Sequence, residues 1–555
     1  MPGADVQAQD GTGPMQAILN SFWWKPTRMG TTSLEVSQAL RWVILLCLAQ
    51  TLLWGLGLGS TRRAPELDSA EQFVWAFSME SGYWKHPPLP SWIMHGLLNV
   101  FGPSVTLPFV ATQLCVTLAL GLTWKLGCEF MSPRRSLIAM ALTSLVTYHN
   151  VGGDSFNHNT VLLPFQAATW LFFYRATRSG AWHQWVLVGL FAGLSMLVKY
   201  VALLPLAGLL VCFVVDRKLH TRRMLAGLAL AVGVFASVML PHALWLKSSS
   251  YLPFHYAQAV SQSLPGLIAT LRALMDFVLI QALRLLPFAL GLWFVLRQTA
   301  KTEPACLANT AAQSFKTSPR DIRFLSIATV TPLLITVLIS LVTETELQSR
   351  WGANAFLLVG WLAMAALPRL DTPRMQRSTV QVVLLAQVLM CSVVVLSKTV
   401  LADHLQIRSR ANFPGEVLAQ QAQATWAQHT SAPLRLVVSD IWLGGNMVAH
   451  SEKHGDRRLA VLIDGRHFKS PWVKEQAVQD CGALVMDDQT DDAAGHAKPD
   501  AALQALMAKA ASQGTWLLPW NGARGGSGNE ASRSAVGKVK WGVLLPQNPA
   551  ACLTR

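Results

Sequence analysis

The chain has 555 residues, of which 52% are hydrophobic and only 14% are charged. A mean hydropathy of +0.34 is too high for a soluble protein of this length and predicts an all-α polytopic membrane protein. The formal net charge is +15. No basic stretch carries the interleaved aromatic residues of a nucleic-acid platform, so we exclude a nucleic acid as a partner.

Residues 1–37 are expected to form a cytoplasmic segment. Gly, Gln and Asp precede any apolar run there, so the pattern of a cleavable signal peptide is lacking and the first span is expected to act as an uncleaved anchor. About eleven apolar segments then predict a transmembrane domain over residues 38–403. The segments cover residues 38–60, 104–125, 136–149, 158–174, 183–199, 201–215, 224–245, 276–296, 322–343, 352–367 and 379–400.

Lysine and arginine gather in every second connection between these segments, which predicts that those connections are cytoplasmic. The alternate connections and the tail of residues 404–555 then face outward. Arg62 and Arg63 stand on the outward side and are exceptions to this pattern. The outward connections are residues 61–103, 150–157, 199–200, 247–275 and 344–351.

The first outward connection carries a pair of acids. Asp68 and Glu71 are three residues apart and share one face of a predicted helix. An apolar stripe runs beside them, so we expect a short amphipathic helix on the outer membrane surface. A carboxylate partly shielded from water there can take a proton from an acceptor. The stripe consists of Leu67, Ala70, Val74 and Phe77.

A basic pair follows in the same connection. Lys85 and His86 stand directly before Pro87 and Pro88, and proline fixes φ, so the prolines can aim this pair at a phosphate. A solvated juxtamembrane loop is an alternative interpretation of the same residues. Other unusual polar residues on the outward side are Asp154, His158, Lys199, His255, Glu344, Glu346 and Arg350.

The tail of residues 404–555 is predicted to be a small soluble α/β domain. Asp440, Asp464 and Asp487 each follow a predicted strand, where they could hold a ligand or act as ordinary cap and turn residues. Cys481 and Cys552 could form a disulfide if the tail is exported. The predicted strands are residues 434–439, 459–463, 483–486 and 541–545, and the predicted helices are residues 471–480 and 499–512.

Three stretches of the first half resemble one enzyme family. They are Asp68-Ser-Ala-Glu71 followed by Gly82-Tyr83 and His86-Pro87-Pro88-Leu89, then Gly153-Asp154 through Tyr174-Arg175-Ala176, and Gly193-Leu194-Ser195-Met196-Leu197-Val198-Lys199-Tyr200. Together they resemble the polytopic GT-C glycosyltransferases, in the bacterial branch related to protein O-mannosyltransferases and the lipid A aminoarabinose transferase. The likeness covers roughly residues 38–215. Arg350-Trp351 also resembles a later stretch of the family, but more weakly. The family has Asp-Glu where this chain has Asp68 and Ser69.

This resemblance implies a reaction and a location. The donor would be a sugar on a polyprenyl phosphate, and the acceptor a lipid, glycan or protein at the outer face of the bacterial inner membrane. The acceptor would attack the anomeric carbon, invert its configuration and release the lipid phosphate. The tail would lie in the periplasm.

The resemblance also assigns roles to residues. Asp68 would be the general base and Asp154 would orient the acceptor. The expected substrate-binding residues, mostly cations for the departing phosphate, are Glu71, Lys85, His86, Lys199 and Arg350. A divalent cation is expected as a possible cofactor, with Glu71, His86, Asp154 and His158 as its ligands. Ordinary alternatives stay open for Lys199, which can snorkel from a helix end, and for His158, which can start a helix.

Two other functions are compatible with a polytopic chain. A lipid-sugar transporter or flippase should carry internal repeats and charged residues near the bilayer midplane, and neither is evident in the sequence. An inactive membrane scaffold stays possible because Ser69 replaces an acid of the family.

Overall fold

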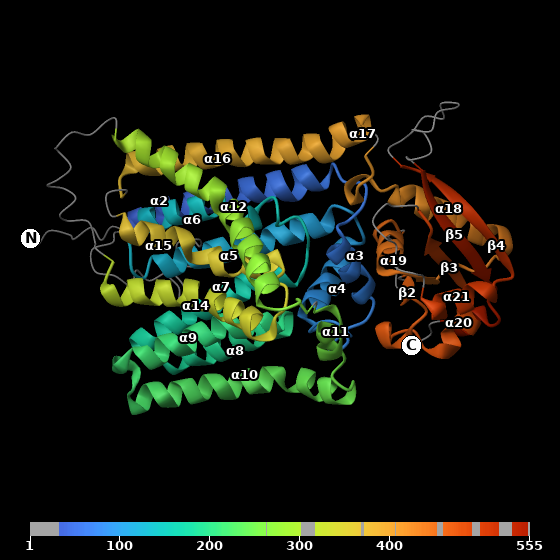
Figure 1. The fold of residues 1–555 in the computed structure, drawn as a ribbon, viewed down its shortest axis with the longest axis horizontal. Coiled ribbons are helices and arrows are strands. Elements are labelled where there is room, and N and C mark those ends of the chain that lie inside the picture. The colour runs from blue at the N-terminus through green and yellow to red at the C-terminus, as the bar shows by residue number, and fades with distance from the viewer. Residues whose placement is uncertain are drawn as a thin grey trace, which may run out of the picture.

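The computed structural model describes residues 33–261, 263–300, 317–367, 371–405, 407–451, 459–490, 500–520 and 536–552. Figure 1 shows a body of long helices lying side by side, with a sheet domain packed against one end of it. Most of the predicted N-terminal segment, residues 1–32, lies outside the described residues. Its role therefore stays a prediction.

The helices of the body begin at recognisable signals. Ser132, Ser318 and Thr372 each accept a hydrogen bond from a backbone N–H of the first turn and precede a proline, which suits the first helical position. Helices of the body are α2 (Ser33–Gln50), continued by the π-helix η1 (Thr51–Gly57), α5 (Leu107–Gly127), α6 (Pro133–Thr143), α7 (His158–Ser179), α8 (Trp182–Val198), α9 (Leu203–Val215), α10 (Arg222–Ser248), α12 (Leu267–Ala300), α14 (Pro319–Thr343), α15 (Val359–Ala366) and α16 (Pro373–Val395).

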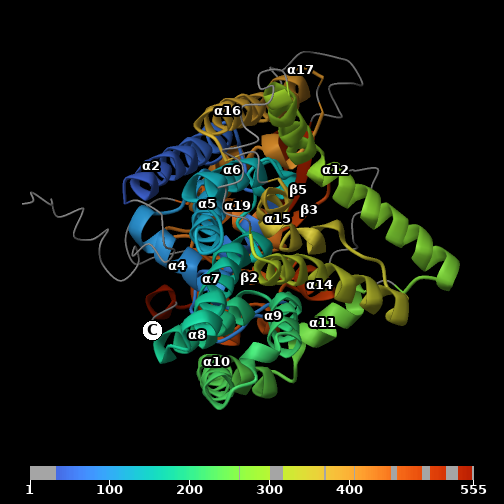
Figure 2. The same ribbon diagram turned by 90° about the vertical axis from the view of Figure 1, so that its left-hand side faces the viewer.

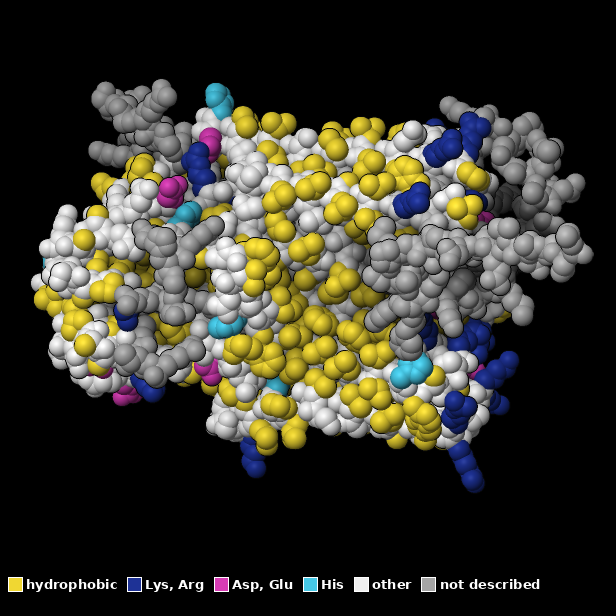
Figure 3. All heavy atoms as spheres, turned by 180° about the vertical axis from the view of Figure 1, so that it is seen from behind, with side chains coloured by type: hydrophobic (Ala, Val, Ile, Leu, Met, Phe, Trp, Pro, Cys, Tyr) yellow, Lys and Arg dark blue, Asp and Glu magenta, His cyan; other side chains and the backbone are white. Residues whose placement is uncertain are grey.

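Several of these helices suit a membrane. Within the described residues, six helical stretches are long and apolar enough to cross one, and two shorter apolar helices, Trp182–Val198 and Tyr200–Val215, accompany them. Hydrophobic side chains cover the middle of the body, and most Lys and Arg in that view gather at the end away from the sheet domain (Figure 3). The six stretches are Leu34–Gly57, Leu107–Gly127, Arg222–Ser248, Leu267–Gln298, Pro319–Thr343 and Pro373–His404.

The structure supports a polytopic protein but not every predicted span. The segment predicted at residues 352–367 is not one helix, because the 3-10 turns Ser349–Gly352 and Ala355–Leu358 precede the eight-residue α15. The segment at residues 136–149 contains only the eleven-residue α6 and a 3-10 turn, Thr147–His149. The number of eleven spans therefore stays a prediction. Figure 2 views the bundle nearly end-on, with α12 running obliquely along its outside.

A layer of short helices joins the body to the sheet domain. It contains α3 (Leu67–Trp75), α4 (Leu89–Phe101) and α11 (Leu252–Val260) (Figure 1). The predicted helix after the first span is present as α3, and its place at the membrane surface stays a prediction, but it does not leave a polar face open to water. Every residue of α3 from Ser69 to Trp75 is buried, because the sheet domain covers the face that the sequence pattern left open to water.

The tail forms a five-stranded mixed sheet in the order β2-β1-β3-β5-β4. β1 (Leu436–Ser439) pairs in parallel with β2 (Ala460–Ile463) and β3 (Ala483–Asp488), while β5 (Val536–Leu544) runs antiparallel to β3 and to β4 (Ser512–Pro519). The four predicted strands are present, although β5 starts earlier than predicted. The tail helices are α18 (Gly415–His429), α19 (Ile441–Ala449), α20 (Glu475–Cys481) and α21 (Ala501–Ala508).

Other predictions for the tail have mixed outcomes. Cys481 and Cys552 form the disulfide that the sequence allowed. Asp440 caps α19 by accepting a hydrogen bond from the N–H of Leu443 at 2.7 Å, and Asp464 pairs with Lys469 at 2.6 Å. Those two acids thus have the ordinary structural roles that the sequence analysis left open.

The tail and the first outer loop share one hydrophobic core. Phe73 and Trp75 of α3 belong to the same buried cluster as Phe413, Leu418 and Val437 of the tail. α19 approaches α3 so closely that a Cβ added to Gly445 would lie 2.4 Å from the Cβ of Ala70. The sheet domain is therefore a packed part of the molecule and not a loosely attached appendage.

Candidate active site

A polar cavity of about 410 Å³ lies where the loops at the sheet-domain end of the body meet the start of the tail. Asp68 comes from α3, Arg350 from the 3-10 turn Ser349–Gly352, and Asp154 from the loop before α7. The cavity thus gathers three predicted site residues that are far apart in the sequence. Its lining consists of Glu66, Leu67, Asp68, Tyr148, Val151, Gly152, Asp154, Ser155, Asn157, Asn159, Thr160, Leu163, Arg284, Arg350, Ala353, Lys398 and Arg410.

Asp68 stands in the first turn of α3 and points its carboxylate at this cavity. Its Oδ2 accepts hydrogen bonds from Arg350 Nη1 at 2.8 Å and from Asn157 Nδ2 at 3.0 Å. The side chain of Asp68 is 33% exposed and that of Arg350 is 62% exposed. The carboxylate is therefore held in place yet reachable by an incoming hydroxyl or amine, as a general base must be.

Ser69, which replaces the family's second acid, has a visible structural role. Its hydroxyl accepts a hydrogen bond from the backbone N–H of Phe156 at 2.9 Å and lies 3.4 Å from the hydroxyl of Ser155. The serine thereby ties α3 to the loop that carries Asp154. The departure from the family pattern leaves Asp68 in place.

Asp154 occupies a strongly charged corner of the cavity. Its Oδ2 lies 3.7 Å from Arg62 Nη2 and 3.7 Å from Lys398 Nζ. The preceding carbonyl, of Gly153, accepts a hydrogen bond from Gln113 Nε2 at 2.8 Å, which fixes the loop against α5. Asp154 is thus positioned by the body and neutralised by two cations.

Lys199 reaches the wall of the same cavity. It follows the last residue of α8, and its ammonium donates a hydrogen bond to Asn159 Oδ1 at 2.7 Å. Asp68 and Arg350 are both close enough to affect its charge electrostatically. The lysine is therefore a cation beside the predicted base and not merely a snorkelling residue.

Lys85 and Glu71 are largely engaged with each other. Lys85 Nζ donates a hydrogen bond to Glu71 Oε2 at 2.5 Å and lies over the rings of Trp84 and Tyr256. Burial raises the pKa of the Glu71 carboxyl above its usual range, against the opposing effect of Lys85. This pair sits beside the cavity, outside its lining.

His86 and His158 lie against each other, with ring centroids 4.1 Å apart. Burial, helped by Lys199 and Lys85, lowers the pKa of His86 to about 3. The imidazole is therefore neutral at pH 7 in the absence of a ligand and can donate a hydrogen bond.

The four predicted metal ligands do not form one cluster, although His86 and His158 lie against each other. In the parts of the chain that the structure describes, no three His, Cys, Asp or Glu side chains gather in a way that could hold a metal ion. Glu71 is bonded to Lys85, and Asp154 faces Arg62 and Lys398. The donor set therefore does not fit a divalent cation, and we derive no step through one.

Several cavity residues were missed by the sequence analysis. Arg62, which pairs with Asp154 but is not part of the cavity lining, was noted only as an exception to the charge pattern, and that exception was the one available signal. The others come from segments with no motif: Glu66, Tyr148, Asn157, Arg284, Lys398 and Arg410. Lys398 lies near the end of the last long apolar stretch, Pro373–His404, and Arg410 lies in the link to the tail, so only the folded chain brings them to the cavity that Asp154 lines.

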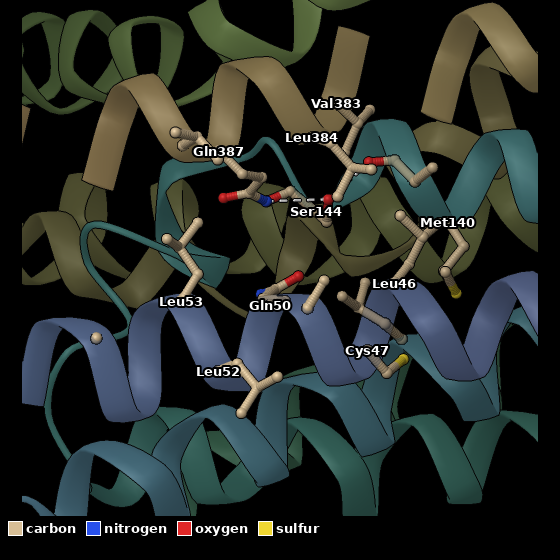
Figure 4. Close-up of a pocket in the computed structure, with 15 residues that line it drawn as sticks. Leu46, Cys47, Gln50, Leu52, Leu53, Met140, Ser144, Val383, Leu384 and Gln387 are labelled. Carbon is tan, nitrogen blue, oxygen red and sulfur yellow. Dashed lines mark hydrogen bonds between the residues drawn. The ribbon is translucent and has the colours of Figure 1, made fainter. Parts of the chain in front are cut away.

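A second cavity, of about 390 Å³, is apolar and lies among α2, α6 and α16 (Figure 4). Gln387 Nε2 donates a hydrogen bond to the Ser144 hydroxyl at 3.1 Å at its polar end. Gln50, also in its wall, donates to Gln113 Oε1 at 3.2 Å, and Gln113 bonds to the carbonyl of Gly153 beside Asp154. Two hydrogen bonds therefore link the wall of the apolar cavity to the loop of the polar one.

Comparisons with known proteins agree with the sequence resemblance. Residues 85–245 match the family described as dolichyl-phosphate-mannose-protein mannosyltransferase. Two lipopolysaccharide core galacturonosyltransferases of Rhizobium johnstonii are similar: RgtA is 27% identical over 189 residues, and RgtB is 26% identical over 215 residues. These alignments cover 33% and 38% of this chain. They span only 37% and 43% of those relatives' own lengths.

The fold resembles that of a solved structure over nearly the whole chain. The crystal structure of ArnT from Cupriavidus metallidurans bound to undecaprenyl phosphate superposes with a TM-score of 0.56 at 13% identity. The match covers 92% of this chain and 99% of that one. The likeness includes the tail, which the sequence resemblance did not reach.

Proposed function

We propose that this chain is a GT-C glycosyltransferase, like the family that its sequence resembles, and that it moves a sugar from a polyprenyl-phosphate donor to an envelope acceptor with inversion. The observation that carries the proposal is the polar cavity, which places two carboxylates, Asp68 and Asp154, among several cations. A base and a positively charged cradle are what transfer from a phosphate leaving group needs.

The apolar cavity supports a donor with a hydrocarbon tail. A lipid-linked sugar needs an apolar place for its chain beside a polar place for its head group. Here a chain of two hydrogen bonds, from Gln50 to Gln113 and from Gln113 to Gly153, links the walls of the two cavities. A soluble nucleotide-sugar donor would have no use for the apolar one.

The reaction is expected to proceed in one displacement. The acceptor hydroxyl or amine gives its proton to Asp68 while it attacks the anomeric carbon, and the bond to the lipid phosphate breaks. Arg350 is mostly exposed and can leave Asp68 to meet the departing phosphate, together with Lys199. Lys85, held by Glu71, is expected to contribute charge from beside the cavity, and His86 is expected to contribute only a hydrogen bond.

The site is proposed to face the periplasm of a bacterial inner membrane. Basic side chains gather at the end of the body away from the sheet domain (Figure 3), which is the arrangement expected if that end is cytoplasmic. The Cys481–Cys552 disulfide suits an oxidising compartment. The acceptor is proposed to be an envelope lipid, glycan or protein, in line with the family and the lipopolysaccharide enzymes that resemble this chain.

Replacing the base tests the proposal directly. Asp68→Asn keeps the shape of the side chain but cannot accept a proton, so we expect turnover to fall ~10²-fold or more with normal expression. Transfer would be measured by mass spectrometry of the modified acceptor at matched protein levels. Asp276→Asn changes an exposed acid outside the cavity and is the matched control.

The same experiment separates the rival functions. Undiminished transfer by Asp68→Asn would remove this residue as the base and leave Asp154 as the candidate. Absence of sugar transfer by the wild-type chain with every lipid-linked donor would favour the transporter or scaffold interpretation.

A further inference from the structure

Arg62 is buried without the hydrogen bonds that its guanidinium needs. Its side chain has no solvent exposure, and within the described parts of the chain its Nε, Nη1 and Nη2 atoms lack hydrogen-bond partners. Its ion-pair partner is Asp154, whose Oδ2 lies 3.7 Å from Arg62 Nη2. The centroid of the Phe109 ring lies 5.9 Å from the guanidinium carbon. Burying an unbonded charge is costly. Arg62 lies outside the lining of the polar cavity, so it favours an anion in the cavity near Asp154 through its charge and not by direct contact.

Two further cations surround the same carboxylate. Lys398 Nζ lies 3.7 Å from the same Asp154 oxygen and is 45% exposed, while Arg410 lines the cavity from the link to the tail. The carboxyl of Glu66 interacts electrostatically with Asp154 and with all three cations. Three positive charges thus face two carboxyl groups, so this corner carries an uncompensated positive charge even when both are ionised.

This corner differs from the group around the proposed base. Arg350 donates its hydrogen bond to Asp68, and Lys199 donates to Asn159. Arg62 and Lys398 instead face Asp154. The polar cavity therefore has two positive centres, and a single leaving phosphate at Arg350 and Lys199 accounts for only one of them.

We propose that Lys398 and Arg410, which line the polar cavity, form a second anion subsite that the charge of the buried Arg62 supports, and that this subsite holds a carboxylate or phosphate group carried by the transferred sugar or by the acceptor. The inference rests on the proposed function, because it concerns the substrates of the same cavity. Planar guanidinium groups and an ammonium suit such oxyanions. The substrate class is accordingly an acidic sugar or an acidic acceptor, in addition to the lipid phosphate.

Binding measurements on the purified full chain in lipid nanodiscs test the subsite. The probes are galacturonate, neutral galactose, inorganic phosphate and undecaprenyl phosphate, each titrated against Lys398→Gln and Arg410→Gln. We expect each substitution to weaken galacturonate or inorganic phosphate about 10-fold or more, the effect of losing one charge-assisted hydrogen bond. Undecaprenyl phosphate affinity should be unchanged. Lys509→Gln removes an exposed lysine of the tail and should match the wild type.

Each outcome decides something. Weakening of galacturonate alone supports an acidic sugar, and weakening of phosphate alone supports a phosphorylated acceptor. The proposal is overturned if galactose binds as tightly as galacturonate, if neither variant changes anion affinity, or if only undecaprenyl phosphate is lost. Because binding needs no turnover, this failure is distinct from failure of the proposed transferase activity, which the Asp68→Asn assay measures.

Discussion

The charged residues of the outer loops differ in what they can do because they differ in burial. Asp68 and Arg350 form a pair that water can reach, so an acceptor can separate them. Glu71 and Lys85 form a pair that is mostly shielded, and removing one partner would leave the other charge buried. The exposed pair is therefore suited to chemistry, and the shielded pair to holding the loop.

His86 should make folding stability depend on pH. Its pKa is about 3 in the folded protein, against an ordinary value of 6.5, so the unfolded chain binds a proton at a pH where the folded chain does not. Its contribution is present above pH 6.5 and is lost as pH falls towards 3. We expect His86→Gln to flatten the fall of the melting temperature over this range, measured by thermal unfolding in detergent.

A matched control is available on the outer side. His255 is exposed, and His255→Gln should leave the acid dependence of the melting temperature as in the wild type. His158 packs against His86 and will retain part of the dependence. If the melting temperature of His86→Gln falls with decreasing pH in parallel with that of the wild type, the lowered pKa of His86 is contradicted.

The sequence analysis named three residues that the structure brings to one polar cavity. Asp68, Asp154 and Arg350 were predicted, because motif and topology both placed them on one side of the membrane. The roles expected for His86 and for a metal could not be judged, because they depend on burial and on which neighbour each side chain meets. Arg62 and Lys398 meet only through the fold, across more than three hundred residues of sequence.

At the scale of elements, α3 is the piece on which both the site and the tail depend. It carries Asp68 at its start and packs against α19 through Ala70. The apolar stripe predicted this helix correctly. It could not predict the burial of the opposite face, because that face is covered by a domain more than 350 residues further along the chain.

Gly445→Ala should disturb α3. The new Cβ would lie 2.4 Å from the Cβ of Ala70 and 2.7 Å from its backbone, closer than atoms pack, so one helix must move. We expect a loss of stability of about 1–3 kcal/mol, by analogy with other overpacked cores. Transfer should also fall because Asp68 shifts with α3. Unfolding in denaturant and the transfer assay would measure both.

The same substitution elsewhere gives the control. Gly96 lies in α4, and a Cβ added there would meet nothing within 4 Å. Gly96→Ala should therefore keep wild-type stability and transfer. If Gly445→Ala and Gly96→Ala behave alike, the close contact between α19 and α3 is not a determinant of the site.

The apolar cavity predicts a dependence on the donor's chain. Leu384 of α16 lines this cavity and is 38% exposed, whereas its neighbour Leu385 is 71% exposed and is not part of the lining. Leu384→Trp should fill the cavity and lower kcat/KM for a long-chain donor about 10-fold, which corresponds to ~1.4 kcal/mol of lost contact. A short-chain donor should be affected less.

Leu385→Trp adds the same ring on the outside of the same helix and should behave as the wild type. Steady-state transfer with donors of two chain lengths would decide the matter. Equal effects of both substitutions, or no dependence on chain length, would place the hydrocarbon chain elsewhere.

Buried strands of the sheet were predicted from the sequence, and the exposed edge strand was not. β1, β2 and β3 are buried almost throughout and read as short apolar runs. β4 was missed because it is an edge strand with alternating exposure that contains Gly514 and ends in Pro519. Its pairing with β5 depends on a partner beyond residue 535, which no local pattern indicates.

For the whole molecule, the orientation in the membrane decides whether the proposed chemistry can occur. The cavity lies at the end of the body that joins the sheet domain, and the Lys and Arg visible in Figure 3 gather mostly at the other end. A lipid-linked donor displayed on the outer leaflet reaches the site only if the basic end is cytoplasmic. The distribution of basic residues and the proposed reaction thus both require the end of the body away from the sheet domain to be cytoplasmic.

Reporter fusions test this orientation. Alkaline phosphatase fused after Arg555 should be active, because it matures only after export, and a cytoplasmic fluorescent protein at the same position should stay dark. The control fusion after Arg217, in the basic turn that follows α9, should give the opposite pair of results.

Free thiols of Cys481 and Cys552 should also be absent without reductant, since an exported tail keeps its disulfide. An inactive phosphatase after Arg555 together with an active one after Arg217 would invert the topology. The cavity would then face the cytoplasm, and a donor on the outer leaflet would be out of its reach.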